Sequence, residues 1–233
     1  MSHAGCSCGS IRRTKVLFVS WDPRGGCYVS EAGKQYETGY ALGDELLAYW
    51  RSMPRDAARG LPHRDALNPA DIKSLLPNIY LLEWTDRDHA IMRLRGTWLD
   101  EQVERPRDNY NLFEQYSKSH GEAYKDFLEA LVSQPCAAAL RRLRVTEFSR
   151  SFCYHTSYFP LAAAPRSGNE GDSPGPGKKD QRIFLVGAGW LEPLDEVAAV
   201  KNSPVLYEGA KTMGFTWIDI GSGVPTGSFF KGG

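Results

Sequence analysis

The stretch from Leu61 to Leu99 constrains the fold more than any other part of this 233-residue chain. After a segment punctuated by prolines, a largely apolar, strand-like segment extends from Asn78 to Trp84, followed by polar residues from Thr85 to His89. A second apolar stretch continues from Ala90 to Leu99. Two short strands joined by a tight polar turn predict a β-hairpin. This hairpin supplies two neighbouring strands of a sheet, and the other segments are interpreted relative to it.

Helical patterns occur on both sides of the hairpin. Between Tyr40 and Met53 apolar residues recur on one helical face, and Pro54 ends the helix. A short helix opens at Asn68-Pro69, and a longer one is predicted over His120–Ser133. Each of the two longer helices carries an apolar stripe that must pack against another element. The stripes are Leu42, Leu46, Tyr49 and Trp50 in the first helix, and His120, Tyr124, Phe127 and Leu131 in the second.

Three further strands are predicted, over Ala139–Phe148, Ser151–Ala164 and Arg182–Leu191. With the hairpin they make a five-stranded antiparallel sheet with helices between its second and third strands. Val16–Trp21 and Phe215–Ile220 are weaker strand candidates. Side chains of the strand beginning at Ser151 alternate between two faces. One face carries Phe152, Tyr154, Thr156 and Tyr158, and the other carries Cys153, His155, Ser157 and Phe159.

Composition divides the chain into a central domain with two extensions. Residues 1–39 are rich in Gly and Ser and are expected to form a flexible N-terminal arm. The domain is predicted over residues 40–193, interrupted at 165–181 by a Gly-, Pro- and Ser-rich segment expected to be a flexible insertion loop. Residues 194–233 form a C-terminal extension that packs on the domain or serves as an interaction arm.

Charge and cysteine content argue against several classes of protein. Lys plus Arg and Asp plus Glu each number 28, so no overall basic field favours nucleic acid. The five cysteines are an odd number in a chain that needs no disulfide staples, which predicts reduced thiols. No segment reaches the roughly 20 apolar residues of a transmembrane helix. We therefore expect a soluble, cytoplasmic protein that binds neither nucleic acid nor membrane.

Arg141, Arg142 and Arg144 form a local basic group in this otherwise neutral chain. On a strand, Arg142 and Arg144 occupy alternate positions and share one face. Without a wider basic field, these arginines predict a face that is solvated or contacts another subunit.

Motifs for catalysis or metal binding are weak. Cys153 and His155 lie two apart on one strand face and could form a nucleophile and base, but no third group orients them. Gly187 and Gly189 follow a strand, yet a dinucleotide fingerprint needs a third small residue where Glu192 stands. The glycines instead predict a close approach of backbone in an antiparallel strand. We expect no metal site and no enzymatic activity.

Several motifs together resemble a family of bacterial single-domain PAS-like proteins. They comprise an aromatic helix ending in Tyr-Trp, a Leu-Pro-x-Arg-x-Asp crossing, a Leu-Leu-Pro entry to the first strand, and an Arg-x-x-Gly-Thr second strand, the one departure here being that Asp65 directly follows Arg64. Here these are Tyr49-Trp50, Leu61-Pro62-His63-Arg64, Leu75-Leu76-Pro77 and Arg93-Leu94-Arg95-Gly96-Thr97. The resemblance covers about residues 40–193. It implies an α+β fold in which helices pack on one face of the five-stranded antiparallel sheet.

The resemblance also implies a sensory or regulatory module, in which a small molecule binds in a cavity between sheet and helices. Its signal would pass to a partner protein through protein contacts, and a homodimer is one expected assembly. The sequence identifies no cofactor. Two other hypotheses stay open, namely a ligand-free interaction or dimerisation adaptor and, more remotely, a small enzyme. The candidate ligand-binding residues are Arg95, Tyr116, His120, Tyr124, Phe127, Cys153, His155 and Trp190.

Overall fold

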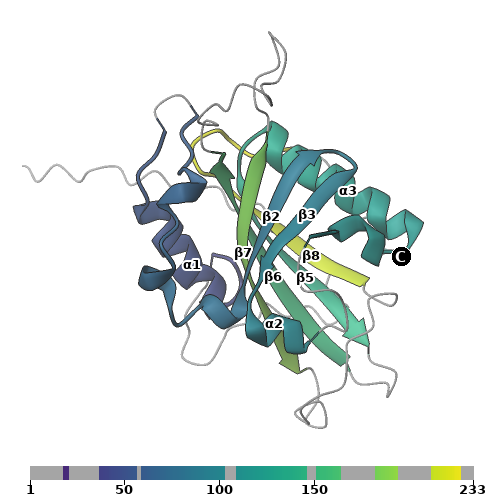
Figure 1. The fold of residues 1–233 in the computed structure, drawn as a ribbon. Helices are drawn as coiled ribbons and strands as arrows, with labels where there is room; N and C mark the ends of the chain where they lie inside the picture. The colour runs from purple at the N-terminus through teal and green to yellow at the C-terminus, as the bar shows by residue number, and fades with distance from the viewer. Residues whose placement is uncertain are drawn as a thin grey trace, which may run out of the picture.

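An antiparallel sheet of eight strands forms the centre of the computed structural model (Figure 1). The structure describes residues 18–20, 37–56, 59–102, 109–145, 151–163, 182–193 and 211–226. Within these ranges the strand order is β1-β8-β5-β6-β7-β2-β3-β4, and every neighbouring pair is antiparallel. The strands are β1 (Phe18–Ser20), β2 (Ile79–Asp86), β3 (His89–Arg95), β4 (Tyr110–Asn111), β5 (Ala137–Val145), β6 (Ser151–Ala162), β7 (Ile183–Pro193) and β8 (Lys211–Ile218).

The helices precede the sheet or connect its strands. They are α1 (Ala41–Ser52), α2 (Thr97–Glu101) and α3 (Lys118–Ser133), with 3₁₀ turns η1 (Arg64–Ala66), η2 (Pro69–Ile72), η3 (Leu76–Asn78) and η4 (Leu112–Gln115). The expected N-cap is present at η2, where the Asn68 side chain accepts a hydrogen bond from the Ala70 amide at 3.1 Å. None of the described helices is long and apolar enough to cross a lipid bilayer.

The predicted hairpin is confirmed, although its second strand is shorter than expected. β2 and β3 pair through Leu82↔Met92 and Trp84↔Ala90. β3 ends at Arg95 rather than Leu99, because Gly96 turns the chain into α2. A Cβ atom at Gly96 would lie 2.1 Å from a backbone carbonyl oxygen of η3, so only glycine fits this turn. The helix α2 therefore occupies the end of the segment predicted as strand.

The sheet is larger than the five strands predicted from sequence. All five are present, in the order β5-β6-β7-β2-β3, and β1, β4 and β8 extend them. β8 includes the candidate strand only as far as Ile218, begins four residues before it at Lys211, and pairs along β5 from Ala137↔Ile218 to Leu143↔Lys211. β1, from the candidate at Val16–Trp21, pairs with β8. Segments of both predicted extensions thus join the sheet, because β5 would otherwise leave its backbone groups unpaired at an edge.

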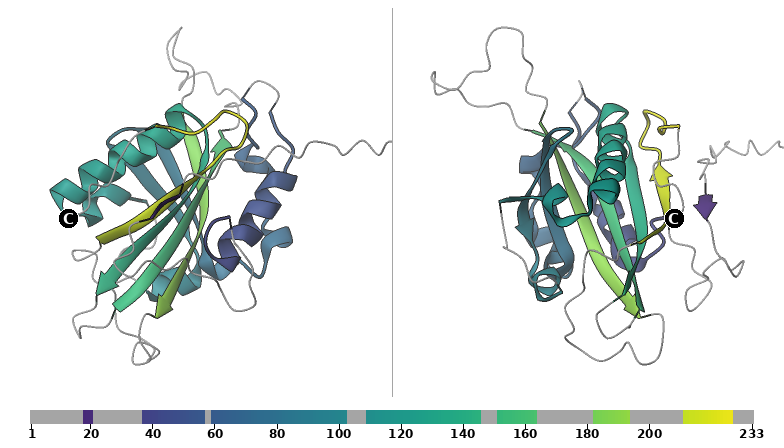
Figure 2. Two further views of the ribbon diagram at one scale, coloured as in Figure 1. Left: turned by 180° about the vertical axis from the view of Figure 1, so that it is seen from behind. Right: turned by 90° about the vertical axis from the view of Figure 1, so that its right-hand side faces the viewer.

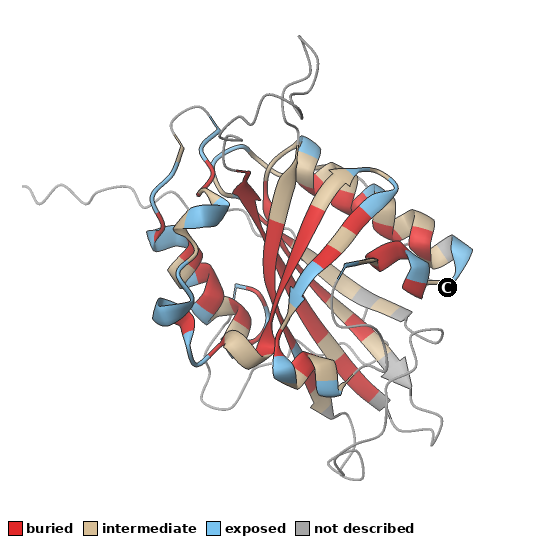
Figure 3. Cartoon of the chain, viewed as in Figure 1, coloured by how far each residue is buried: buried red, intermediate tan, exposed pale blue. Residues whose placement is uncertain are grey.

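Helices cover both faces of the sheet, which corrects the expectation that they pack on one face only. Alternate residues of β2 belong to two separate cores, since Ile79 and Leu81 pack with α1 while Tyr80 and Leu82 pack with α3. The central strands are buried along most of their length (Figure 3). In the right-hand view of Figure 2, α3 lies between the β2–β3 hairpin and β8, so the sheet curves around it.

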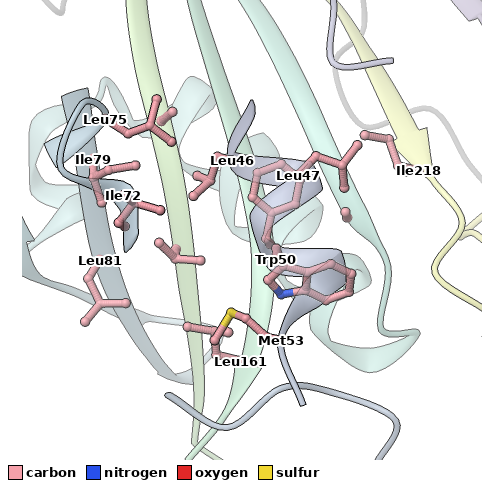
Figure 4. Packing of buried hydrophobic residues seen from close by; sticks show 14 of the residues in the cluster. Leu46, Leu47, Trp50, Met53, Ile72, Leu75, Ile79, Leu81, Leu161 and Ile218 are labelled. Carbon is pink, nitrogen blue, oxygen red and sulfur yellow. The ribbon is translucent and has the colours of Figure 1, made fainter. Parts of the chain in front are cut away.

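The core on the α1 face confirms the predicted stripe of this helix. Leu46 and Trp50 are fully buried, and Leu47 is nearly so. Figure 4 shows these side chains between α1 and the sheet, beside residues of the 3₁₀ turns. The Trp50 indole Nε1 donates a hydrogen bond of 2.9 Å to the carbonyl oxygen of Pro160 in β6. This bond and the apolar contacts fix α1 against the middle of the sheet.

A matched pair of leucine substitutions tests this core. Leu47→Ala should lower the free energy of unfolding by about 2–5 kcal/mol, since it opens a cavity under α1. Leu94→Ala removes the same atoms from a side chain that is 46% exposed and should change stability by less than about 0.5 kcal/mol. Urea unfolding followed by circular dichroism measures both, and equal losses would contradict the described packing of α1.

Candidate functional site

The core on the α3 face contains a small, partly open cavity lined by both polar and apolar side chains. Its volume is about 30 Å³, which is room for about two water molecules. The walls come from β2, β3, β4, β5, β6, α2, α3 and the segment around η4. The lining residues are Tyr80, Leu82, Met92, Arg95, Leu99, Tyr110, Leu112, Gln115, Tyr116, Tyr124, Arg142, Tyr154, Thr156 and Tyr158.

Two glycines of β7 make room for this site. A Cβ atom at Gly187 would lie 2.0 Å from the carbonyl oxygen of Ser157 and 2.3 Å from the ring of Tyr80. At Gly189 it would lie 2.7 Å from Leu99 and 2.9 Å from the hydroxyl of Tyr154. The sequence prediction of close backbone approach at these glycines is confirmed. Their missing side chains allow tyrosine rings to fill the α3 face of the sheet.

Tyrosine hydroxyl groups form hydrogen bonds beneath the cavity. The hydroxyls of Tyr124 and Tyr158 bond to one another, and that of Tyr158 donates to Thr156 Oγ1 at 3.3 Å. The Tyr80 hydroxyl donates to the carbonyl oxygen of Ser157. Burial raises the pKa of Tyr80 and Tyr124 well above the usual value of a phenol. Both phenols are therefore neutral at physiological pH.

Arg142 of β5 is a buried cation at the edge of this network. Only 2% of the residue is exposed. Its Nη1 donates to the Tyr116 hydroxyl at 2.7 Å and its Nη2 to Thr156 Oγ1 at 3.3 Å. The guanidinium lies 5.1 Å from the ring centroid of Tyr154 and 5.5 Å from that of Tyr124. Arginine stays protonated in proteins, so this site carries a full positive charge.

No carboxylate among the described residues pairs with Arg142. Its partners are hydroxyl groups and aromatic rings, and its Nε atom has no hydrogen-bond partner among them. Taking an ion out of water costs several kcal/mol unless an opposite charge compensates for it. Arg142 therefore carries a positive charge that the surrounding phenols do not neutralise.

Arg95 of β3 lines the same cavity but is compensated. Its Nε donates to Asp100 Oδ1 at 2.5 Å, and its Nη1 donates to the Tyr110 hydroxyl at 3.0 Å. The side chains of Arg95 and Asp100 are 4% and 12% exposed. The turn at Gly96 allows this pairing, because it starts α2 directly after β3 and brings Asp100 back to the strand. Of the two arginines in the wall, Arg95 is thus the one with a carboxylate.

Gln115 of η4 is a second buried polar group with unused hydrogen-bonding capacity. It is 3% exposed, and neither its amide nitrogen nor its amide oxygen bonds to a described residue. Most buried polar atoms in folded proteins have a partner, so such an amide requires a specific explanation. Gln115 and Arg142 both line the cavity, which concentrates donors and an acceptor at one place.

The burial of Arg142 corrects the prediction that it lies on a solvated or subunit-contacting face. The error came from treating Arg142 with Arg141 and Arg144 as one basic group. Alternation along β5 instead places Arg142 with Leu140, which packs under α3. That apolar neighbour two positions away was the available signal. Nothing comparable pointed to Gln115.

The structure brings together only part of the predicted ligand-binding set. Arg95, Tyr116 and Tyr124 line the cavity. Two others from α3 contact these residues without lining it, since the His120 ring lies 5.1 Å from Tyr116 and the Phe127 ring lies 6.1 Å from Tyr124.

The remaining three predicted residues lie away from the cavity. Cys153 and His155 alternate with the lining residues of β6 and point to the other face, as their predicted strand pattern implies. Trp190 is 40% exposed and stacks on Trp98 at 5.3 Å. These three residues do not line this cavity, because strand alternation turns Cys153 and His155 to the other face and Trp190 lies at the surface. Their contact with a ligand stays a prediction.

Cys153 and His155 instead form a cluster with Glu192 of the neighbouring strand. One ligand atom from each of the three lies within 4.8 Å of the others, a combination that is able to hold a metal ion. His155 Nε2 lies 3.0 Å from Glu192 Oε2, and this bond holds the pKa of the Glu192 carboxyl below its usual value. Glu192 is the orienting group that sequence analysis did not find. Burial raises the pKa of the Cys153 thiol to about 12, so it is not a ready nucleophile.

Comparison with known proteins matches the part of the chain that builds the cavity. A sequence model of the family described as "PAS domain" matches residues 41–169, which is more than half of the chain. This range contains every residue that lines the cavity. No curated protein and no solved structure matches the chain.

Alkylation kinetics test whether Cys153 acts as a nucleophile. The rise of its thiol pKa from a usual 9.0 to about 12 lowers the thiolate fraction about a thousandfold near neutral pH. Iodoacetamide should therefore label Cys153 far more slowly in the folded chain than in urea, as followed by peptide mass spectrometry. Cys136 is an internal control, because burial also raises its pKa to about 12. Rapid labelling of Cys153 alone would support a catalytic thiol.

Proposed function

The chain belongs to the PAS domain family, and from this membership we propose that it is a sensory or regulatory module whose cavity binds a small molecule. The match confirms the resemblance that the sequence motifs carry. The cavity between α3 and the sheet lies where the resemblance implies a ligand. Binding would alter the packing of α3, and the change would pass to a partner protein through protein contacts.

The observation that carries this proposal is the presence of unpartnered polar groups in the wall of a cavity. A module with a purely structural core would gain stability from apolar residues at Arg142 and Gln115, since buried polar groups without partners are costly. Both residues are at least nine-tenths buried and both line the same cavity. A ligand that bonds to them would offset the cost of keeping them there.

The size of the cavity limits the ligand. Pockets for drug-sized ligands typically measure about 300–1,000 Å³, whereas this one measures about 30 Å³. The ligand, or the part of it that enters, must therefore be small. A ligand shifts a protein between states only through different affinities for them, so a larger molecule would require a more open arrangement of α3.

The surface of the described residues offers apolar side chains through which a signal could pass to a partner protein. Leu94 and Trp190 are the large hydrophobic side chains exposed there. They are candidate contact points for a partner or a second copy of the chain. A cytoplasmic location is part of the proposal, supported by the free thiols of Cys136 and Cys153.

Native mass spectrometry and an absorption spectrum of protein purified from its own host test the proposal directly. The expected result is a mass shift that disappears on denaturation and identifies a small bound molecule. Protein without a ligand that still captures a defined partner would favour the adaptor hypothesis. Such a result would overturn the proposal of ligand binding.

A pair of substitutions on β2 tests whether the ligand occupies this cavity. Leu82→Phe adds a ring to the cavity wall and should reduce ligand occupancy at least about tenfold. Leu81→Phe adds the same volume on the opposite face, where α1 packs, and should leave occupancy unchanged. Overpacking should cost each variant about 1–3 kcal/mol, so unfolding curves must accompany the mass spectra. Equal loss of ligand in both would place the binding site elsewhere.

A further inference from the structure

We propose that the ligand of the cavity is an anion with a planar oxyanion group, such as the carboxylate of a small organic acid, and that Arg142 binds this group. This inference rests on the proposed function, because it assigns a chemical class to the molecule in the same cavity. It draws on the unpaired charge of Arg142, on the hydrogen-bonding capacity of Gln115, and on the size of the cavity.

The charge balance of the cavity wall requires a negative partner. Asp100 is the carboxylate within hydrogen-bonding distance of Arg95, and no described carboxylate lies that close to Arg142. The phenols around Arg142 donate and accept hydrogen bonds but remain uncharged. Aromatic faces attract a cation only weakly compared with an opposite charge. An anionic ligand in this cavity would supply the missing charge.

The available donors suit a planar oxyanion. A guanidinium group presents its N–H donors in a flat fork that matches two carboxylate oxygens. In Arg142 the Nη atoms already donate to Tyr116 and Thr156, while Nε has no partner among the described residues. The amide of Gln115 adds an N–H donor and a carbonyl acceptor to the same wall. A bound oxyanion would therefore lie beside both side chains.

The volume agrees with a head group of this size. Two water-sized positions correspond to the two oxygen atoms of a carboxylate. Chloride would also accept hydrogen bonds from these donors, but as a single atom it cannot present two oxygens to the flat fork of a guanidinium. A phosphate group carries four oxygens and would need a larger space. The described walls thus favour a small carboxylate, with inorganic nitrate as an ion of the same planar shape.

Isothermal titration and thermal unfolding of the full chain test the inference with defined probes. Sodium acetate and sodium nitrate are compared with sodium chloride at equal ionic strength and with neutral acetamide. Acetate should bind saturably and raise the midpoint of unfolding, whereas acetamide should not. If nitrate binds and acetate does not, the ligand is still a planar oxyanion, but an inorganic one.

Substitution of Arg142 provides the decisive variant. Arg142→Met should weaken acetate binding roughly ten- to a hundredfold, because it removes a charge-assisted hydrogen bond. Without the anion this variant should unfold at the same or a higher temperature than the original chain, since the unpaired charge is gone. Arg141→Met is the matched control, because it removes the same charge from the neighbouring position on the other face of β5. It should bind acetate unchanged.

A conservative variant keeps the test valid if Arg142→Met does not fold. Arg142→Lys retains the positive charge and loses the planar fork, so acetate should bind at least about tenfold more weakly. The molecule released from host-purified protein gives a separate readout and should be an anion at neutral pH. A neutral released molecule whose occupancy is insensitive to Arg142 would overturn the anion inference and leave the proposed function intact. Absence of both a released molecule and any binding of acetate or nitrate would overturn both.

Discussion

The fold depends on a sheet whose central strands are buried on both faces. Because side chains alternate along a strand, each of β2, β6 and β7 contributes one set of residues to the core under α1 and another to the core under α3. The two sets differ in chemistry. The α1 face is closed mainly by aliphatic residues with Trp50, Phe159 and Tyr40, while the α3 face is richer in tyrosines and other aromatic rings. The cavity forms on the second face because rings leave spaces that their hydroxyl groups line.

The polar wall of the cavity conflicts with the stability of the domain, and this conflict is informative. A buried arginine without a carboxylate and a glutamine without hydrogen bonds each destabilise a folded chain. Such local violations are expected at functional sites, where the requirements of binding outweigh those of packing. Arg95 shows that the same wall can compensate a guanidinium when a carboxylate lies on the adjoining helix. The uncompensated state of Arg142 is therefore specific to that position and is not a general property of the wall.

The elements with long and regular patterns were predictable from sequence, whereas the site depends on contacts between distant segments. The hairpin, α1, α3 and the alternation of β6 follow from periodicity, and the PAS resemblance follows from motifs at the same places. The strand count was too low because β1 and β4 have only three and two residues, and because β8 lies in a segment predicted as an extension outside the domain. Arg142 was predicted to lie on a solvated or subunit-contacting face because the interpretation of β5 gave more weight to the cluster of charges than to the alternation of side chains along the strand. Asp100, Glu192 and Gln115 gain their roles from neighbours on other elements, which no local pattern contains.

The two faces of the sheet meet at Ser157 of β6. On the α3 face, the hydroxyl of the cavity residue Tyr80 donates to the Ser157 carbonyl oxygen. On the α1 face, Ser157 Oγ accepts hydrogen bonds from the Tyr40 hydroxyl at 2.9 Å and from the Ala188 amide at 3.2 Å. Tyr40 directly precedes α1. A contact path alone does not establish coupling, which requires an element with two arrangements that a ligand biases. Displacement of Tyr80 would therefore either move the start of α1 or break a buried hydrogen bond, and breaking such a bond is costly.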